Sequence, residues 1–187
     1  MAQHTTVTEE LTRDHREIEE LLGRLDGLPA GDPARKERLD QATIALVQHG
    51  MAKETHLYPA LESHAPDGAE LAERGRRDTA DVERLLKDAE GHEAGAPEFD
   101  RLAGALAEKF RTQRQDEERH LYPALESALG RKRLLELGER VRETKAKAPT
   151  RPRPTGPDDP SPNRLLGGGL GFVDRIRDAA TGRGGGR

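Results

Sequence analysis

Apolar residues recur at helical spacing through most of the first 147 residues. Val7, Leu11 and Ile18 begin the series, and Leu21, Leu22 and Leu25 continue it. Intervals of three and four residues place side chains on one face of a helix. The pattern predicts helices over about residues 7–28, 33–64, 68–90, from 97 through the second HLYPALES block, and 131–147.

Polar residues and prolines mark where these helices start. Thr6 to Glu9 reads T-V-T-E, the order of a capping box. Asp32 followed by Pro33 predicts an N-cap and a first helical residue, and Pro97 opens a helix in the same way. Pro59 and Pro123 fall inside helices, where a proline removes a backbone bond, so we expect each helix to bend or end there.

The segment HLYPALES occurs twice, at residues 56–63 and 120–127, an offset of 64 residues. The same offset pairs Asp14 with Asp78 and Glu19 with Glu83. Repeated units of this kind bury their apolar faces against each other. We therefore predict an all-α fold: an up-down-up-down four-helix bundle made of two duplicated helical hairpins, with a short fifth helix and a Pro/Gly-rich tail.

Composition changes sharply after the fifth predicted helix. The run APTRPRPTGPDDPSPN at 148–163 is too rich in proline for a helix, so it predicts an extended linker. We divide the chain into a bundle with its capping helix at 1–147, a Pro/Gly-rich linker at 148–168 and a short basic amphipathic tail at 169–187. Phe172 and Ile176 of that tail are expected to dock on the bundle or on a protein partner.

Charge and residue usage exclude several classes of function. Residues 1–144 carry 31 acidic against 22 basic residues, and an acidic body argues against nucleic acid as the ligand. The chain has no cysteine, which excludes disulfides and thiolate metal sites. It shows neither a long apolar run nor a secretory leader, so we expect no membrane span and a cytoplasmic location.

Polar side chains with metal-binding chemistry share the inner helix faces. His49, Lys53 and His56 form one stripe on the second helix, and Gln113, Glu117 and His120 form the equivalent stripe on the fourth. The first and third helices add two pairs, His15 with Glu19 and Thr79 with Glu83. The interior of a four-helix bundle is a usual place for a metal site built from His and Glu.

These residues stand in a pattern that resembles the hemerythrin-like proteins of the HHE cation-binding type. The resemblance rests on DHREIEELL at 14–22, on His49 and on ETHLYPALE at 54–62, and it covers about residues 7–145. It implies a non-haem di-iron centre that handles dioxygen or nitric oxide. In that family each half supplies one His from its first helix, then a His and a Glu four residues apart from its second.

Three of the six positions implied by the resemblance keep a ligand in this chain, namely His15, His49 and Glu117. Lys53 stands where the first carboxylate belongs, and Thr79 and Gln113 stand where two histidines belong. The substitutions remove two imidazoles and one carboxylate and add an ammonium group.

Three hypotheses follow for the centre. In the first, metal is held by a rebuilt set of ligands, His15, His49, His56, Glu117 and His120, with Glu54, Glu83 or Glu118 as further carboxylates. In the second, a Lys53–Glu117 ion pair replaces the metal in an interaction or regulatory module. In the third, His56 and His120 are solvated at the rim and recur only because the segment is repeated.

By resemblance, the expected function is non-haem iron binding for oxygen, nitric oxide or iron sensing, or for redox stress response. The expected partners are a metal ion, dioxygen or nitric oxide, and a protein that the basic tail contacts. The sequence contains no phosphate-binding loop and no Ser-His-Asp motif, and no substrate pocket can be inferred from it, so we expect no enzymatic activity.

Overall fold

The computed structural model describes residues 5–148, which are helical in every regular element and contain no strand. The predicted linker beyond Ala148 and the predicted tail lie outside the described residues. The all-α prediction is confirmed. The elements in chain order are α1 Val7–Asp26, α2 Ala34–Ala52, η1 Lys53–Leu57, α3 Tyr58–His64, α4 Gly68–Glu90, α5 Pro97–Asp116, η2 Glu117–Leu121, α6 Tyr122–Ala128 and α7 Arg131–Lys147.

The helix starts follow local hydrogen bonding. At α1 the capping box forms as predicted, because Thr6 N–H donates to Glu9 Oε2 at 2.7 Å and Glu9 N–H donates to Thr6 Oγ1 at 3.3 Å. The start of α2 differs from the prediction by one residue. Pro33 is the N-cap rather than the first helical residue, and Asp32 Oδ1 instead accepts from Ala34 N–H at 2.9 Å.

The two internal prolines are accommodated by π-helical turns. η1 and η2 each span five residues, and each ends one residue before the tyrosine that precedes the proline. Tyr58 N–H donates to Lys53 O, and Tyr122 N–H donates to Glu117 O, so the chain passes Pro59 and Pro123 without leaving the helix. Lys53 and Glu117 are therefore the first residues of the two π-helical turns, positions that often serve a function.

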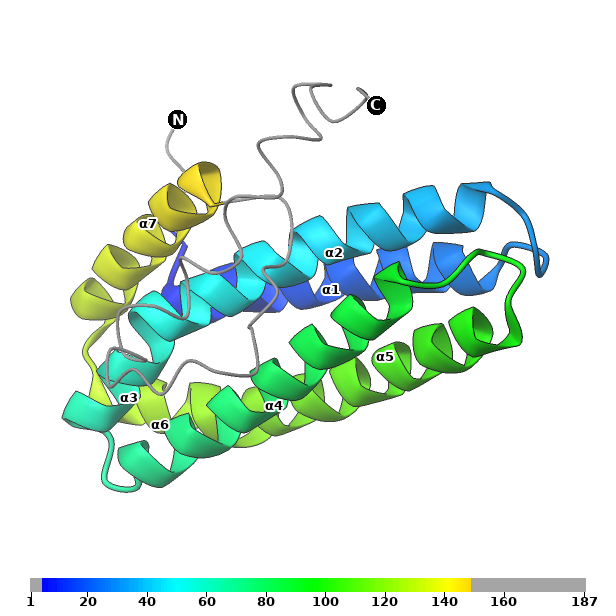
Figure 1. Cartoon of the computed structure of the whole chain (residues 1–187). Helices are drawn as coiled ribbons and strands as arrows, with labels where there is room; N and C mark the ends of the chain where they lie inside the picture. Colours follow the sequence, from blue (N-terminus) through cyan, green and yellow to red (C-terminus); the bar gives the residue numbers. More distant parts are fainter. Residues whose placement is uncertain (1–4, 149–187) are drawn as a thin grey trace, which may run out of the picture.

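The long helices form two antiparallel hairpins, α1 with α2 and α4 with α5, lying side by side in one bundle (Figure 1). The helix α7 packs against α1, α2 and η1. It lies very close to Thr5, because a Cβ at Gly138 would stand 2.2 Å from Thr5 O. At the far end the two hairpin loops meet, where Gly31 adopts φ +84° and donates its N–H to Ala94 O.

The core consists of two apolar clusters with a polar layer between them. One cluster contains Leu11, Leu57 and Leu121 near the α3 and α6 end, and the other contains Ile18 and Phe110 nearer the hairpin loops. His15 lies between Leu11 and Ile18 along α1 and is fully buried. Burial of the two clusters supplies the main drive for folding, and it places the polar layer in a region with little water.

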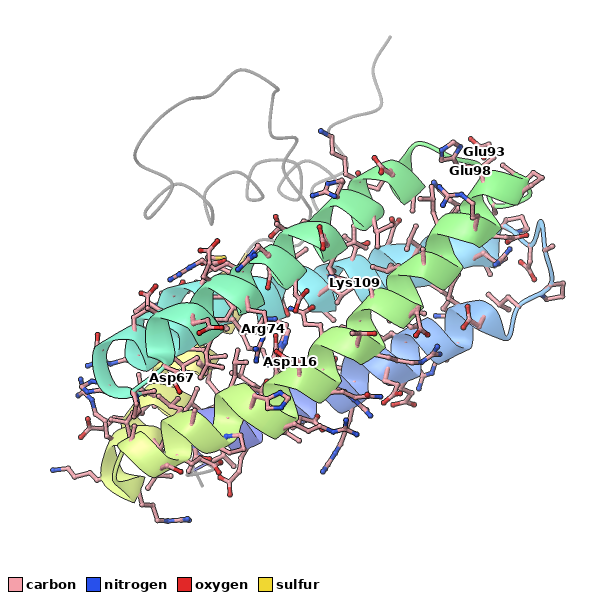
Figure 2. All side chains as sticks on the ribbon, turned by 90° about the horizontal axis from the view of Figure 1, so that it is seen from below. Asp67, Arg74, Glu93, Glu98, Lys109 and Asp116 are labelled. Carbon is pink, nitrogen blue, oxygen red and sulfur yellow. The ribbon has the colours of Figure 1, made fainter. Side chains whose placement is uncertain are left out.

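Charged side chains cover the outside of the bundle (Figure 2). Arg74 on α4 pairs with Asp116 on α5 at 2.8 Å, and Lys109 on α5 pairs with Asp78 on α4 at 2.7 Å. Partly exposed pairs of this kind contribute little to stability individually. Among residues 5–148, no helix has both the length and the apolar character that crossing a membrane requires.

Candidate metal centre

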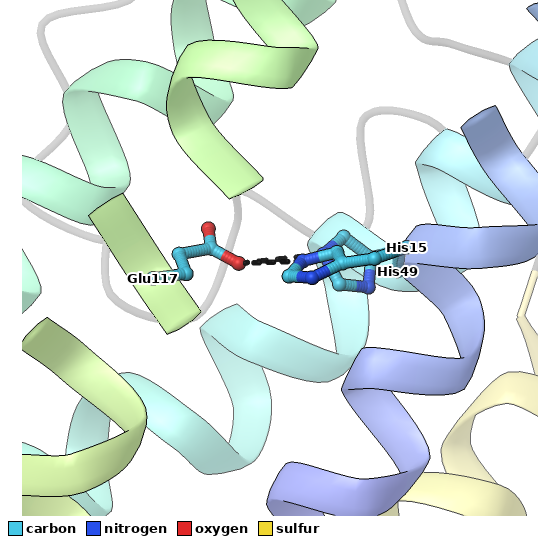
Figure 3. A group of neighbouring side chains, drawn as sticks. All are labelled: His15, His49 and Glu117. Atoms are coloured by element: carbon cyan, nitrogen blue, oxygen red, sulfur yellow. Dashed lines mark hydrogen bonds and ion pairs between the residues drawn. The ribbon is translucent and has the colours of Figure 1, made fainter. Parts of the chain in front are cut away.

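Three buried donors from three elements converge in the polar layer. His15 comes from α1, His49 from α2 and Glu117 from η2 (Figure 3). Glu117 Oε2 lies 3.0 Å from His15 Nε2 and 3.6 Å from His49 Nε2. The exposed fractions of the three residues are 0% for His15, 2% for His49 and 1% for Glu117, so solvent does not compete for these atoms.

A carboxylate contacts the outer nitrogen, Nδ1, of each imidazole ring. His15 Nδ1 lies 2.8 Å from Glu118 Oε1, and His49 Nδ1 lies 3.4 Å from Asp14 Oδ2. A metal-binding histidine usually donates its other ring N–H to such a carboxylate, which fixes the tautomer and leaves the inner nitrogen as an acceptor. The arrangement points the Nε2 atoms of both rings at Glu117.

Asp14 is itself held by α7. Lys145 Nζ pairs with Asp14 Oδ1, while Asp14 Oδ2 faces His49. Burial acts to raise the pKa of Asp14, but the hydrogen bond with His49 and the charge of Lys145 outweigh it and leave the pKa below the ordinary value. Asp14 is therefore an ionised carboxylate that orients His49, and the last turn of α7 takes part in positioning the centre.

Three polar atoms face one another at the centre, namely a carboxylate oxygen of Glu117 and the Nε2 atoms of His15 and His49. Burial lowers the pKa of His15, which favours its neutral form. Burial acts to raise the pKa of Glu117, but the Lys53 charge and the imidazole hydrogen bonds hold it well below the ordinary value. His49 Nε2 finds no hydrogen-bond partner among the described residues. When the ring protons sit on the Nδ1 atoms, toward Glu118 and Asp14, two imidazole nitrogens and a carboxylate oxygen converge as acceptors, and a cation satisfies all three.

The other carboxylate oxygen of Glu117, Oε1, already accepts hydrogen bonds. Lys53 Nζ lies 2.5 Å from Glu117 Oε1, and Gln113 Nε2 donates to the same oxygen at 3.0 Å. Gln113 Nε2 also donates to Thr79 Oγ1 at 3.1 Å, and Tyr58 OH lies 3.0 Å from that hydroxyl. Lys53 is 1% exposed and Glu117 is 1% exposed, so this is a buried ion pair.

Tyr122 packs directly against His15. Its hydroxyl donates to Glu117 Oε2 at 3.2 Å and lies 3.2 Å from His15 Nε2, and its ring stacks on the His15 ring. Burial and the Glu117 charge raise the pKa of Tyr122 well above its usual value. The phenol therefore keeps its proton and can share it with Glu117 or His15.

The donor set fits one metal ion. Two ligands bound to a single ion at about 2.1 Å lie roughly 3.0 to 3.4 Å apart. The two distances from Glu117 Oε2, 3.0 and 3.6 Å, are close to this range, and the three donors lie within 4.8 Å of one another. Two histidines with one carboxylate are the ligands of many non-haem iron sites, and they also suit zinc and manganese.

The structure brings together only part of the ligand set predicted from the sequence. His15, His49 and Glu117 meet, whereas His56 and His120 do not join them. His56 Nε2 hydrogen-bonds to Thr144 Oγ1 of α7 at 2.7 Å. His120 is exposed and hydrogen-bonds to Asp116 at 2.8 Å.

The three additional carboxylates also differ in position. Glu118 contacts His15 Nδ1 rather than the inner nitrogens, and Glu54 pairs with Arg76. Glu83 lies on the Lys53 side, where it lines a cavity of about 10 Å³. Burial of the carboxyl group, helped by the Glu54 charge, raises the pKa of Glu83 to about 7.

Sequence reasoning missed three residues that position the centre. Asp14 and Lys145 orient His49, and Tyr122 contacts both His15 and Glu117. A usable signal existed for Asp14, because histidine ligands commonly have a carboxylate behind them and Asp14 adjoins His15. Lys145 gave no such signal, because its contact depends on how α7 packs on α1.

Fold and site together define a helical-bundle protein with a buried His/His/carboxylate centre. Residues 6–125 match the hemerythrin HHE cation binding domain, and the chain belongs to that family. An uncharacterised hemerythrin-like protein of Schizosaccharomyces pombe is 25% identical over 175 residues, which span 93% of this chain and 86% of the relative.

A solved structure shares the fold. The crystal structure of a hemerythrin HHE cation binding domain-containing protein from Mycobacterium kansasii aligns with a TM-score of 0.67. The sequences are 20% identical, and the match covers 76% of this chain and 89% of the other. This likeness concerns the fold, and the ligands of the present chain rest on its own side chains.

Proposed function

We propose that this protein binds non-haem iron between His15, His49 and Glu117 and serves in oxygen, nitric oxide or iron sensing, or in redox stress response. The observation that carries the proposal is the convergence of three buried acceptors, one of which, His49 Nε2, lacks any hydrogen-bond partner among the described residues. Membership of a cation-binding family supports the same conclusion. Bound iron would supply a centre that dioxygen or nitric oxide can coordinate.

The surroundings favour small ligands over organic substrates, so we propose a binding protein rather than an enzyme. The cavity beside Lys53 and His49 has a volume of about 10 Å³, enough for about one water molecule. A wider, open cleft of about 410 Å³ is lined by Glu118 and Tyr122, both of which contact His15. The cleft gives an ion or a diatomic molecule an approach to the His15 side of the centre.

Anaerobic reconstitution with ferrous iron tests the proposal. Elemental analysis should find iron in the reconstituted protein, and exposure to air or nitric oxide should change its optical spectrum. His15→Ala and His49→Ala should abolish iron binding, while His56→Ala and His120→Ala should leave it intact. Equal iron contents in all four variants would overturn the assignment of the ligands.

A second candidate function rests on the buried Lys53–Glu117 pair. Nζ and Oε1 lie 2.5 Å apart, and both residues are 1% exposed, so the pair can join the hairpins without a metal. In this alternative the bundle is an interaction or regulatory module, and the basic tail is proposed to bind a protein partner. A protein that stays folded and whose melting temperature does not respond to ferrous, cobalt or zinc ions would favour it.

A further inference from the structure

We propose that the ammonium group of Lys53 takes the place of a second metal ion, so that the centre is built for one metal and one lysine sharing the Glu117 carboxylate. The inference rests on the proposed metal binding at His15, His49 and Glu117. It adds to that proposal the number of bound ions, which is one, and it names Lys53 as the residue that prevents a second ion from binding.

The two oxygens of Glu117 face different halves of the centre. Oε2 faces the Nε2 atoms of His15 and His49, at 3.0 and 3.6 Å. Oε1 accepts from Lys53 Nζ at 2.5 Å and from Gln113 Nε2 at 3.0 Å. One oxygen of this carboxylate therefore faces two imidazole nitrogens, of which His49 Nε2 lacks a hydrogen-bond partner among the described residues, and the other oxygen faces the ammonium group of Lys53.

The histidine side and the lysine side of the centre correspond to the two halves of the sequence, which are related by the 64-residue offset. His15 is equivalent to Thr79, His49 to Gln113 and Lys53 to Glu117. In the first two pairs, the first half of the sequence has an imidazole where the second half has a hydroxyl or an amide. The third pair sets a cation against an anion, and its two members bond to each other across the centre.

Lys53, Thr79 and Gln113 each have a hydrogen-bond partner on the lysine side, whereas one imidazole nitrogen on the histidine side has none among the described residues. Gln113 donates to Thr79 Oγ1 at 3.1 Å, and Tyr58 lies 3.0 Å from the same hydroxyl, so Thr79 and Gln113 are engaged with each other and with their neighbours. On the histidine side, His49 Nε2 lacks a hydrogen-bond partner among residues 5–148. An added cation is needed on one side only.

Space and charge on the lysine side act against a second ion. The cavity there, lined by Lys53, Thr79, Glu83 and Gln113, has a volume of about 10 Å³. The ammonium group would repel a divalent ion placed beside it, and it already neutralises the Glu117 charge. Among the described residues that line the cavity, Glu83 carries the one carboxyl group, and its pKa is raised to about 7 by burial and the Glu54 charge.

Counting bound ions in the unaltered protein tests the inference. Equilibrium dialysis against cobalt(II), followed by elemental analysis, should give one ion per chain. Two ions per chain would overturn the inference and leave the proposed metal binding intact. The absence of any bound ion would overturn both, so the two failures can be told apart.

Two sets of variants test Lys53 itself. T79H/Q113H restores two imidazoles but keeps Lys53, and it should still bind one ion, whereas T79H/Q113H/K53E should bind two. Lys53→Met alone should bind cobalt(II) at least about tenfold more tightly, because a repelling charge is removed. Lys109→Met is the matched control, since Lys109 pairs with Asp78 and Asp81 on the surface, and its affinity should not change.

The opposite results would overturn the role of Lys53. These are a second ion bound by T79H/Q113H, a single ion in the folded triple variant, or unchanged affinity in Lys53→Met. Thermal melting followed by circular dichroism establishes that each variant is folded. If the triple variant does not fold, the ion count of the unaltered protein and the Lys53→Met affinity still decide the question.

Discussion

Lys53 and Glu117 occupy equivalent places in the two hairpins, 64 residues apart, and they bond to each other with Nζ 2.5 Å from Oε1. Each is the first residue of a π-helical turn. An equivalent position in two similar halves carries a positive charge in one and a negative charge in the other. The centre is therefore asymmetric, although the helices around it are arranged alike.

Removing one member of this pair should destabilise the metal-free protein strongly. Lys53→Met leaves Glu117 as a buried charge without its cation, which should lower the free energy of unfolding by about 3 to 5 kcal/mol. Combining Lys53→Met with Glu117→Leu removes both charges and should cost much less. Urea denaturation of the chelator-treated proteins measures the difference.

Lys109→Met is the control for that experiment, because its ion pairs are partly exposed and should contribute about 1 kcal/mol or less. If the single and double variants at Lys53 and Glu117 lose the same stability, the two charges do not depend on each other and the structural role of the pair is disproved.

Asp14 should control metal affinity without binding the metal. Asp14→Asn weakens the hold on His49 Nδ1 and on Lys145, and loss of such a supporting carboxylate typically costs about 10- to 100-fold in affinity. Competition with a chromophoric chelator measures the affinity. The equivalent Asp78→Asn alters a surface pair with Lys109 and should have no effect, so equal losses in both variants would contradict the assignment.

Glu83 should make stability depend on pH in a definite direction. Its folded pKa of about 7 lies above the ordinary 4.5. Between these values the folded protein binds more protons than the unfolded one, so this group lowers stability as pH rises through the window. Glu83→Gln should gain up to about 1 kcal/mol near pH 8 and nothing near pH 4. The figure is reduced because Glu83 as a whole residue is exposed to solvent, although it lines the small cavity and neighbouring atoms crowd its carboxyl group.

The control for Glu83 is Glu19→Gln at the equivalent position. Glu19 pairs with Arg114 across the bundle, so its replacement should bring no gain near pH 8. Chemical denaturation of both variants at the two pH values gives the comparison. A Glu83→Gln effect of the same size at both values would show that desolvation of this carboxyl group does not govern the change.

Gly75 should be required for the placement of Tyr58. A Cβ at Gly75 would stand 2.6 Å from Tyr58 Cε1, so Gly75→Ala must displace a buried ring that bonds to Thr79. We expect a loss of about 1 to 3 kcal/mol in thermal or urea unfolding. Gly104→Ala is the control, because a Cβ there meets no described atom within 4 Å and should stabilise α5 by roughly 0.5 to 1 kcal/mol. Equal effects would contradict the packing.

Much of the fold could be predicted from the sequence because its signals are local. The capping box at Thr6 and the apolar periodicity located α1, and the bounds of α4 and α7 agree with those expected. The π-helical turns were not predicted. They depend on a change from i→i+4 to i→i+5 bonding, and residue type gives no signal for that change beyond the following proline.

The unpredicted turns also explain the position of two histidines. In a regular helix His56 would share a face with His49, and His120 would share a face with Gln113. Both lie inside π-helical turns, which alter the register. His56 hydrogen-bonds to Thr144 of α7, and His120 hydrogen-bonds to Asp116, four residues before it. His15, His49 and Glu117 precede or begin the π-helical turns, so the ordinary helical spacing correctly predicted that their side chains face the interior.

The measurement that tests the account most directly is anomalous diffraction at the iron absorption edge from crystals of the reconstituted protein. We predict one anomalous peak among His15 Nε2, His49 Nε2 and Glu117 Oε2, with Lys53 Nζ still bonded to Glu117 Oε1. A peak at His56 or His120 with none among these three atoms, or no peak in the bundle, would contradict the account.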